Sequence, residues 1–187
     1  MNNQELYSQK IRRFLDKLVD FWGYPFDYEI RICTGNFICL VRDQILYFSD
    51  ICSDHYDDSL VRMQLIYTYL IYSRNHAVMR MTQCQGGAGL HQALASLEEF
   101  TCGELGIEYI SQEVLYQKER EFINSFDFQS KLAMGDALFE KRKLNHHYTV
   151  TSVNDNVTMR DDEGDEITLE QADIENYYIL KKDIVPE

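Results

Sequence analysis

The sequence predicts an α+β fold in which a helical body with a small antiparallel β-meander precedes a C-terminal domain of short strands. Helical periodicity runs through most of residues 1–126, three strand-like segments follow one another closely within that part, and β-like stretches fill the chain from about residue 131. Helices and strands are therefore grouped, and they do not alternate as in a doubly wound parallel sheet. The length of 187 residues allows two domains, which we place at residues 1–128 and 129–187.

The first predicted element is an amphipathic helix over residues 3–22, ended by Gly23 and Pro25. Its apolar stripe consists of Tyr7, Ile11, Phe14, Leu18 and Phe21. Three strand-like segments follow, separated by turn-like spacers of hairpin length, and they predict a three-stranded antiparallel meander. These segments span residues 26–33, 36–41 and 44–49.

The second predicted helix, over residues 57–75, is apolar on nearly all sides, which is typical of a central buried helix. A glycine-rich loop over residues 82–89 leads to two further helices, over residues 90–105 and 111–126. The loop lacks the Lys-Ser/Thr pair of a phosphate-binding P-loop and follows a helix instead of a strand. We interpret it as a connection between helices.

The C-terminal domain consists of short β-like stretches separated by turn residues such as Asn154-Asp155 and Glu163-Gly164-Asp165. So many short strands close together, with little helical periodicity between them, predict a small open barrel. The stretches span residues 135–140, 147–153, 156–161, 166–170 and 176–180.

The chain is acidic, with 31 Asp and Glu against 18 Lys and Arg and a formal net charge of −13. This balance argues against direct nucleic-acid binding and against binding to an anionic membrane, because both need a surplus of cations. Nine acidic residues and one basic residue lie between Asp155 and Glu175. Within this stretch we predict that a protein partner, itself basic, binds to Asp161, Asp162, Glu163, Asp165 and Glu166. The turn does not match a calcium-binding EF-hand loop, because Met159 stands where an acid is required.

The five cysteines are odd in number and include no Cys-x-x-Cys pair, which favours buried, reduced thiols in a cytoplasmic protein. A disulfide between Cys33 and Cys39 across a hairpin is the alternative. The N-terminus has no apolar core of signal-peptide length, and the most apolar run, residues 65–72, is far shorter than the roughly 20 residues of a membrane-spanning helix. We therefore expect a cytoplasmic protein without a membrane segment.

A search for catalytic or metal-binding patterns finds one helical stripe that carries His91, Glu98 and Cys102. His91 and Cys102 are roughly 16 Å apart along a helix, too far to share one ion. We interpret the stripe as a partly exposed helix face with a buried cysteine. No Gly-x-Ser-x-Gly turn or activated cysteine is recognisable, so we predict no catalytic residue, no metal site and no cofactor.

Residues 131–182 contain the stretch GDALFE followed by YTVTSVNDNVTMRDDEGDEITLE. This rhythm of short strands and a tight acidic hairpin resembles the SH3-like small barrels appended to many bacterial and phage proteins. The resemblance implies a module that binds peptides, nucleic acids or a neighbouring domain, and it does not select among them.

Residues 1–126 resemble zincin-type metallopeptidases in the order of their elements. The segment SLEEFTCGELGI, residues 96–107, is similar to the family's later ligand-bearing segment, with Glu99 at the position of the glutamate ligand. The helix QLIYTYLIYSRNH lacks the His-Glu-x-x-His motif, and Tyr67, Thr68 and Ile71 occupy that spacing instead. The resemblance therefore implies a degenerate scaffold, a pseudo-metallopeptidase without zinc chemistry.

Our leading hypothesis is a non-enzymatic cytoplasmic interaction protein. One version is an acidic inhibitor or immunity-type protein, from a phage or other mobile element, that blocks a basic nucleic-acid-handling protein by presenting carboxylates in place of phosphates. The alternatives are a divergent metallopeptidase-like hydrolase and a regulatory peptide-binding module. The oligomeric state is left open.

Overall fold

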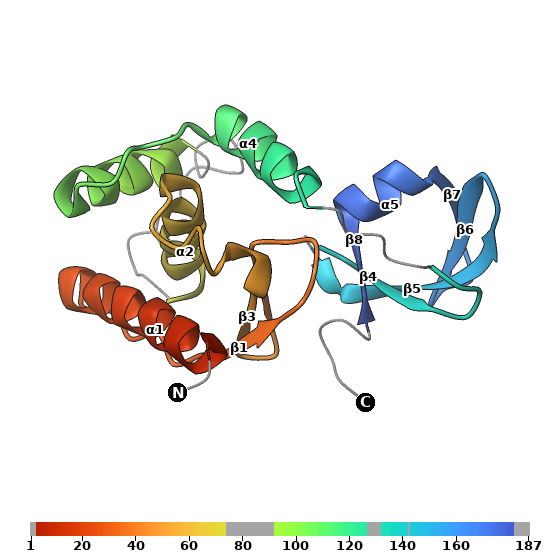
Figure 1. Cartoon of the computed structure of the whole chain (residues 1–187), viewed down its shortest axis with the longest axis horizontal. Coiled ribbons are helices and arrows are strands. Elements are labelled where there is room, and N and C mark those ends of the chain that lie inside the picture. The colour runs from red at the N-terminus through yellow and green to blue at the C-terminus, as the bar shows by residue number, and fades with distance from the viewer. Residues whose placement is uncertain (1–2, 74–91, 127–131, 142, 182–187) are drawn as a thin grey trace. The chain divides into compact units, whose positions relative to one another are not determined.

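The computed structural model describes residues 3–73, 92–126, 132–141 and 143–181. The fold is mixed α+β, and its elements are labelled in Figure 1. The chain divides into two compact units, one of Met1–Ile30 with Cys52–Glu121 and the other of Arg31–Ile51 with Phe122–Glu187. We call them the first unit and the second unit. The sequence placed the boundary in chain order between residues 128 and 129, and that boundary stays a prediction.

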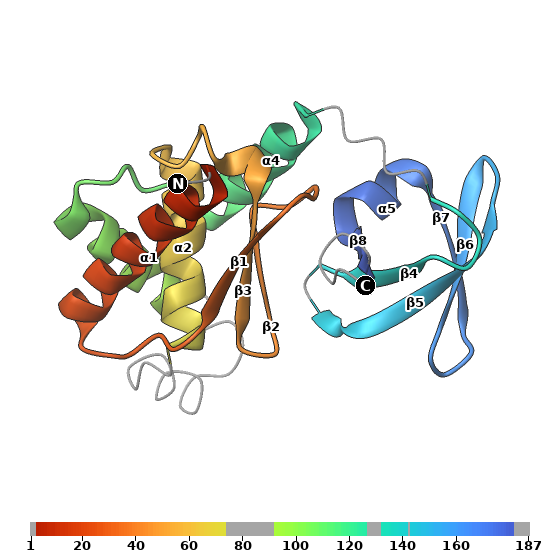
Figure 2. The same ribbon diagram turned by 60° about the horizontal axis from the view of Figure 1, so that its bottom comes forward.

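The first unit is built from helices. These are α1 (Asn3–Trp22), α2 (Ser59–Tyr72), a helix over residues 92–105, and α4 (Gln112–Asn124), whose last residues belong to the second unit. Helices α1 and α2 pack side by side, as both ribbon views show (Figure 1, Figure 2). Tyrosine hydroxyls connect the neighbouring segments: Tyr56, before α2, donates to the carbonyl oxygen of Lys10 in α1 at 2.6 Å, and Tyr69 of α2 donates to that of Tyr24, after α1, at 2.7 Å.

The prediction that the second helix is buried is confirmed for α2. In α2 the buried side chains are Val61, Met63, Leu65, Ile66, Thr68, Tyr69 and Leu70. The predicted apolar stripe of α1 is confirmed for Tyr7, Ile11, Phe14 and Leu18, all buried. It is wrong for Phe21, which is 38% exposed. Phe21 lies in the last turn of α1, and its ring contacts two other aromatic rings near the surface, at centroid distances of 5.3 and 5.9 Å.

The small sheet has three strands, as predicted: β1 (Glu29–Cys33), β2 (Cys39–Arg42) and β3 (Ile45–Ser49). The predicted meander is wrong in strand order, because the order is β1-β3-β2 and β3 is central. The hairpin of β2 and β3 turns through Asp43 and Gln44, both at positive φ, which is typical of a two-residue hairpin turn.

The segment between β1 and β2 packs into the core and does not form a tight hairpin turn. Phe37 and Ile38 are buried there and are not part of a strand. Ser49 holds this segment, since its hydroxyl donates to the carbonyl oxygen of Gly35 at 2.6 Å and its amide to that of Ile38 at 3.0 Å. A Cβ on Gly35 would lie 2.4 Å from the buried Phe37 ring, so any larger residue would force this ring to move.

The second sheet has five antiparallel strands: β4 (Ala137–Glu140), β5 (Lys143–Val153), β6 (Asn156–Asp161), β7 (Glu166–Glu170) and β8 (Tyr178–Leu180). Their order is β7-β6-β5-β4-β8. The predicted strands form one antiparallel sheet, and this sheet is not closed into a barrel, because β7 and β8 are its two edges. The short helix α5 (Gln171–Tyr177), which the sequence did not predict, separates these two strands along the chain.

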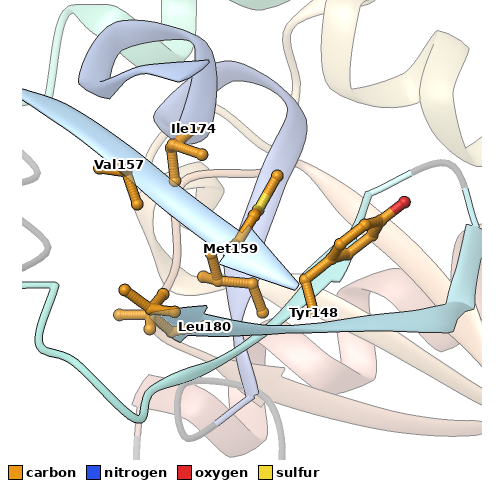
Figure 3. Close-up of a cluster of buried hydrophobic side chains, with 7 residues drawn as sticks. Tyr148, Val157, Met159, Ile174 and Leu180 are labelled. Atoms are coloured by element: carbon orange, nitrogen blue, oxygen red, sulfur yellow. The ribbon is translucent and has the colours of Figure 1, made fainter. Parts of the chain in front are cut away.

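Helix α5 supplies part of the core beside this sheet. Ile174 lies with Val157 and Met159 of β6, as Figure 3 shows. The whole buried cluster consists of Leu138, Tyr148, Val150, Val157, Met159, Ile174 and Leu180. Burying large apolar side chains of this kind contributes roughly 1.5–3 kcal/mol each.

A second cluster joins the small sheet to the five-stranded sheet within the second unit. It consists of Phe37, Tyr47, Phe139 and Ile179. The guanidinium of Arg42 lies 4.2 Å from the centroid of the Phe139 ring, and Lys141 donates to the carbonyl oxygen of Asn36 at 2.6 Å. Residues far apart in the sequence therefore share one core.

Candidate functional site

The turn between β6 and β7 brings together all five predicted partner-binding carboxylates. Asp161 organises it: its Oδ1 accepts hydrogen bonds from the amides of Glu163 at 3.0 Å and of Asp165 at 2.9 Å. The amide of Asp161 donates to the carbonyl oxygen of Asp165 at 3.0 Å. Gly164 has φ of +96°, a conformation that glycine adopts without strain. The carboxylate of Asp161 is thus committed to holding the turn.

Two of the other carboxylates lie beside cationic or titratable side chains. Asp162 lies 3.2 Å from Nε2 of His147, and Glu166 accepts from Arg160 at 2.5 Å. Both carboxylate side chains remain at least half exposed, at 69% and 50%. Exposed pairs of this kind contribute little to stability, because water screens them.

The remaining two, Glu163 and Asp165, stand exposed on either side of Gly164. Their backbone amides bind Asp161, so their positions are fixed while their side chains face solvent. We call Glu163 and Asp165, together with Asp162 and Glu166, the exposed acidic turn. The sequence predicted the group correctly as one turn, but it did not separate Asp161, which is a structural residue, from the exposed four.

A second set of polar groups lies buried in the first unit around Glu98. This side chain is 0% exposed, and both of its carboxylate oxygens accept from Nε2 of Gln112, at 3.0 and 2.8 Å. The contact joins the helix over residues 92–105 to α4. Burial raises the pKa of Glu98 to about 7, against the opposing effect of the Gln112 hydrogen bond. The prediction of a partly exposed face is wrong for this residue.

Cys102 lies one turn further along the same helix and is also fully buried, as predicted. Its Sγ lies 3.1 Å from Sδ of Met63 in α2. Burial, with the charge of Glu98 as a smaller cause, raises the pKa of this thiol to about 11. A thiol with a pKa this high stays protonated at neutral pH and is a poor nucleophile.

The Glu98 set does not form a metal site in the part of the chain that the structure describes. No group of three His, Cys, Asp or Glu that could hold a metal ion occurs among those residues. His91, the third member of the predicted stripe, lies outside them, as do His76, Cys84 and the glycine-rich loop. Gln112 is the partner that sequence reasoning missed, because its position seven residues beyond the helix end gives no periodic signal.

The zincin-like positions and the cysteine pair were the other candidates of the sequence analysis. At the zincin-like positions Thr68 is buried, whereas Glu99 is exposed on the helix over residues 92–105. The cysteines within the described ranges are free thiols, so the alternative disulfide between Cys33 and Cys39 is not formed. In those ranges no helix is both long and apolar enough to cross a membrane.

Comparison with known proteins adds no relative to these observations. No family model, no curated protein and no solved structure matches the chain.

Proposed function

We propose that the chain is a binding protein that docks onto a basic protein partner through the exposed acidic turn of the second unit. The observation that carries this proposal is the fixed turn itself. Asp161 and Gly164 hold the backbone, so four neighbouring carboxylates are presented in one place without rearrangement on binding. Groups that are already ordered lose less conformational entropy when a partner binds.

Electrostatics determine what kind of partner fits. Four carboxylates close together, in a chain of net charge −13, attract a positively charged surface and repel phosphate groups. Such complementary fields raise association rates and exclude partners of the wrong charge. The favoured partner is therefore a basic protein and not a nucleic acid.

The five-stranded sheet provides a scaffold for such a binding module. Its last strand, β8, pairs with its first strand, β4, and a short helix, α5, precedes β8. In this proposal the sheet is the scaffold, and the β6–β7 hairpin is the recognition element.

In the inhibitor version of the proposal, the normal ligand of the partner is a nucleic acid. A cytoplasmic enzyme that handles nucleic acid has a basic surface for phosphates, and the exposed acidic turn would occupy that surface with carboxylates. An immunity-type or phage-encoded inhibitor would act in this way.

The test compares two full-length variants with equal changes of charge. Glu163→Lys/Asp165→Lys reverses two exposed carboxylates of the turn and leaves Asp161 intact. Asp16→Lys/Asp27→Lys reverses two exposed carboxylates of the first unit and serves as the control. Tagged wild-type and variant proteins capture partners from the native host, and the dissociation constant for the enriched protein is then measured at several salt concentrations.

We expect the wild type and the control to retain a basic protein, with binding that weakens as salt increases. The turn variant should bind it about tenfold or more weakly, since charge pairs at such interfaces contribute more than 1 kcal/mol. Binding at full strength by the turn variant, or affinity that is unchanged in molar salt, would overturn the proposal.

A further inference from the structure

Strand β7 is an edge of the five-stranded sheet, so one side of its backbone has no neighbouring strand among the described residues. It pairs there with β6 alone, at the end of the strand order β7-β6-β5-β4-β8. The amides and carbonyls of such an edge can bind an extended segment of another chain, which then continues the sheet. The register of the β6–β7 pair identifies the residues that offer these groups.

Two hydrogen bonds of β6 show to which neighbouring strand its backbone groups point. The amide of Asp161 donates to the carbonyl oxygen of Asp165 at 3.0 Å, which directs the backbone of Asp161 towards the β7 side. The carbonyl oxygen of Thr158 accepts from the hydroxyl of Thr151, in β5, at 3.2 Å. Backbone groups of successive residues point to alternate sides of a strand, so the odd-numbered residues of β6 face β7 and the even-numbered ones face β5.

The open side of β7 therefore carries the backbone groups of Glu166, Thr168 and Glu170. Thr168 lies opposite Thr158 in the register, so its amide and carbonyl point away from β6. The hydroxyls of the two threonines lie 3.1 Å apart, as expected for a closely spaced pair of this kind. Glu170 is the N-cap of α5, whose first turn uses its carbonyl. The amides of all three residues and the carbonyls of Glu166 and Thr168 remain for another strand.

The two faces of β7 indicate which side chains an added strand needs. Glu166, Thr168 and Glu170 are exposed on one face. Ile167 and Leu169 are partly buried on the other face and pack against the core of this sheet. An added strand extends both faces, because its side chains lie beside those of the residues opposite. Basic side chains therefore fit opposite the two glutamates, and apolar side chains fit opposite Ile167 and Leu169.

The charge of the hairpin stays negative when its base is counted. Arg160 is the one Lys or Arg between Asp155 and Glu175, and it pairs with Glu166 at 2.5 Å. Nine acidic residues lie in the same stretch, so the edge attracts a strand that carries positive charge.

We propose that β7 binds a segment of a basic protein partner as an added strand, in which basic and apolar side chains alternate. Its basic residues, four positions apart, lie opposite Glu166 and Glu170. Every pairing within this sheet is antiparallel, and the added strand takes the same direction. This inference rests on the proposed function, because the exposed acidic turn selects the same basic partner, and it adds how the backbone of that partner is held.

The test titrates the full chain with the peptide Lys-Val-Thr-Val-Lys, capped at both ends. Two further forms carry one N-methyl group, either on the amide of the central threonine or on that of the second valine. In antiparallel pairing the threonine amide donates to the carbonyl of Thr168, whereas the valine amides point away from β7. Methylation of the threonine should weaken binding about tenfold or more, and methylation of the valine should leave it nearly unchanged. The peptide Glu-Val-Thr-Val-Glu should not bind.

Hydrogen exchange, followed residue by residue by NMR, locates the bound strand. The amides of Glu166, Thr168 and Glu170 should exchange more slowly when Lys-Val-Thr-Val-Lys is bound. The amides of Ile167 and Leu169 should change little, because they belong to the ladder with β6 in the free protein.

A matched pair of variants removes the backbone donor from the protein side. Thr168→Pro eliminates an outward amide, which an edge strand tolerates, and should weaken binding of the parent peptide about tenfold or more. Thr168→Val keeps the amide and removes only the hydroxyl that contacts Thr158, so binding should be unchanged. If Thr168→Pro fails to fold, the methylated peptides make the same comparison on the wild type.

The outcomes separate this inference from the proposed function. Equal binding of the two methylated peptides, lost in Glu163→Lys/Asp165→Lys, would reveal charge attraction alone; it would overturn the added strand and leave the proposed function standing. Alternating protection that persists at full affinity in that variant would support the added strand and contradict recognition by the turn. Absence of saturable binding would overturn the inference. Protection of the same amides that grows with protein concentration, without peptide, would identify a second copy of this chain as the occupant and would also overturn it.

Discussion

Glu98 of the first unit and Asp161 of the second are both carboxyl groups that accept two hydrogen bonds, yet they differ in their access to water. Asp161 borders on solvent and accepts from two backbone amides, and in this position it holds a turn. Glu98 is fully buried and accepts from one side-chain amide, so the same charge is costly there. Burial outweighs the hydrogen bonds that Glu98 accepts, and its pKa is raised for that reason.

The largest effect that tests this comparison is expected for Glu98→Gln. The pKa of Glu98 is raised from 4.5 to about 7 by burial, so the unfolded chain releases this proton at lower pH than the folded chain. The contribution to stability is therefore fully present below pH 4.5 and is lost as pH rises towards 7 and above. The difference corresponds to about 3 kcal/mol at 1.36 kcal/mol per pH unit.

Glutamine cannot ionise, so the variant should be more stable than the wild type at pH 8 by up to about 3 kcal/mol and nearly equal to it at pH 4. Urea denaturation followed by Trp22 emission measures both values. Glu99→Gln, which changes the exposed neighbour, is the control and should change stability by less than about 0.5 kcal/mol at either pH. An unchanged pH dependence in Glu98→Gln would show that Glu98 is charged in the folded protein at neutral pH.

An intermediate effect is expected for Asp161→Ala. The substitution removes the acceptor of two backbone amides, and the loss of such a turn-holding side chain costs about 1–2 kcal/mol. Hydrogen exchange at the amides of Glu163 and Asp165 measures the loss directly. Asp161→Asn keeps an acceptor oxygen and should retain most of the protection. Equal exchange in the alanine and asparagine variants would contradict the assigned role.

The smallest effect is expected for Glu166→Gln. Glu166 pairs with Arg160, but both side chains are about half exposed, at 50% and 54%. Loss of the pair should change the free energy of unfolding by less than about 1 kcal/mol, and salt should reduce even that difference. Thermal denaturation at low and at moderate salt gives the values. A larger, salt-independent loss would place Glu166 in the same class as Asp161.

The sequence was informative where one local pattern decides the outcome. The all-round apolar run of α2 predicted a buried helix, and the alternation of acids with Gly164 predicted the hairpin turn. Prediction from the sequence failed where burial depends on contacts between residues far apart in the chain. Phe21 fits the stripe of α1 by spacing but contacts Phe100, and no helical periodicity of α1 contains that information.

The sheets show the same limit. Phe37, between β1 and β2, is buried with Phe139 from a strand about a hundred residues later, and no local pattern predicts that contact. Helix α5 was not predicted because a helix of seven residues has too little apolar periodicity to be recognised. In the structure it connects β7 and β8, the two edge strands of the open sheet. The state of Glu98 could not be foreseen either, since it depends on burial and on Gln112, which belongs to another helix.

The acidic residues of strand β7 also disfavour association of the protein with copies of itself. It is an edge of the five-stranded sheet, so one row of its backbone amides and carbonyls is left for pairing with another chain. Its exposed positions include Glu166 and Glu170. Two copies that approached edge to edge would bring these like charges together, which disfavours sheet extension and aggregation. This repulsion is kept only while both positions carry the same sign of charge, so variants of this hairpin for binding studies should leave Glu166 and Glu170 unchanged or reverse both together.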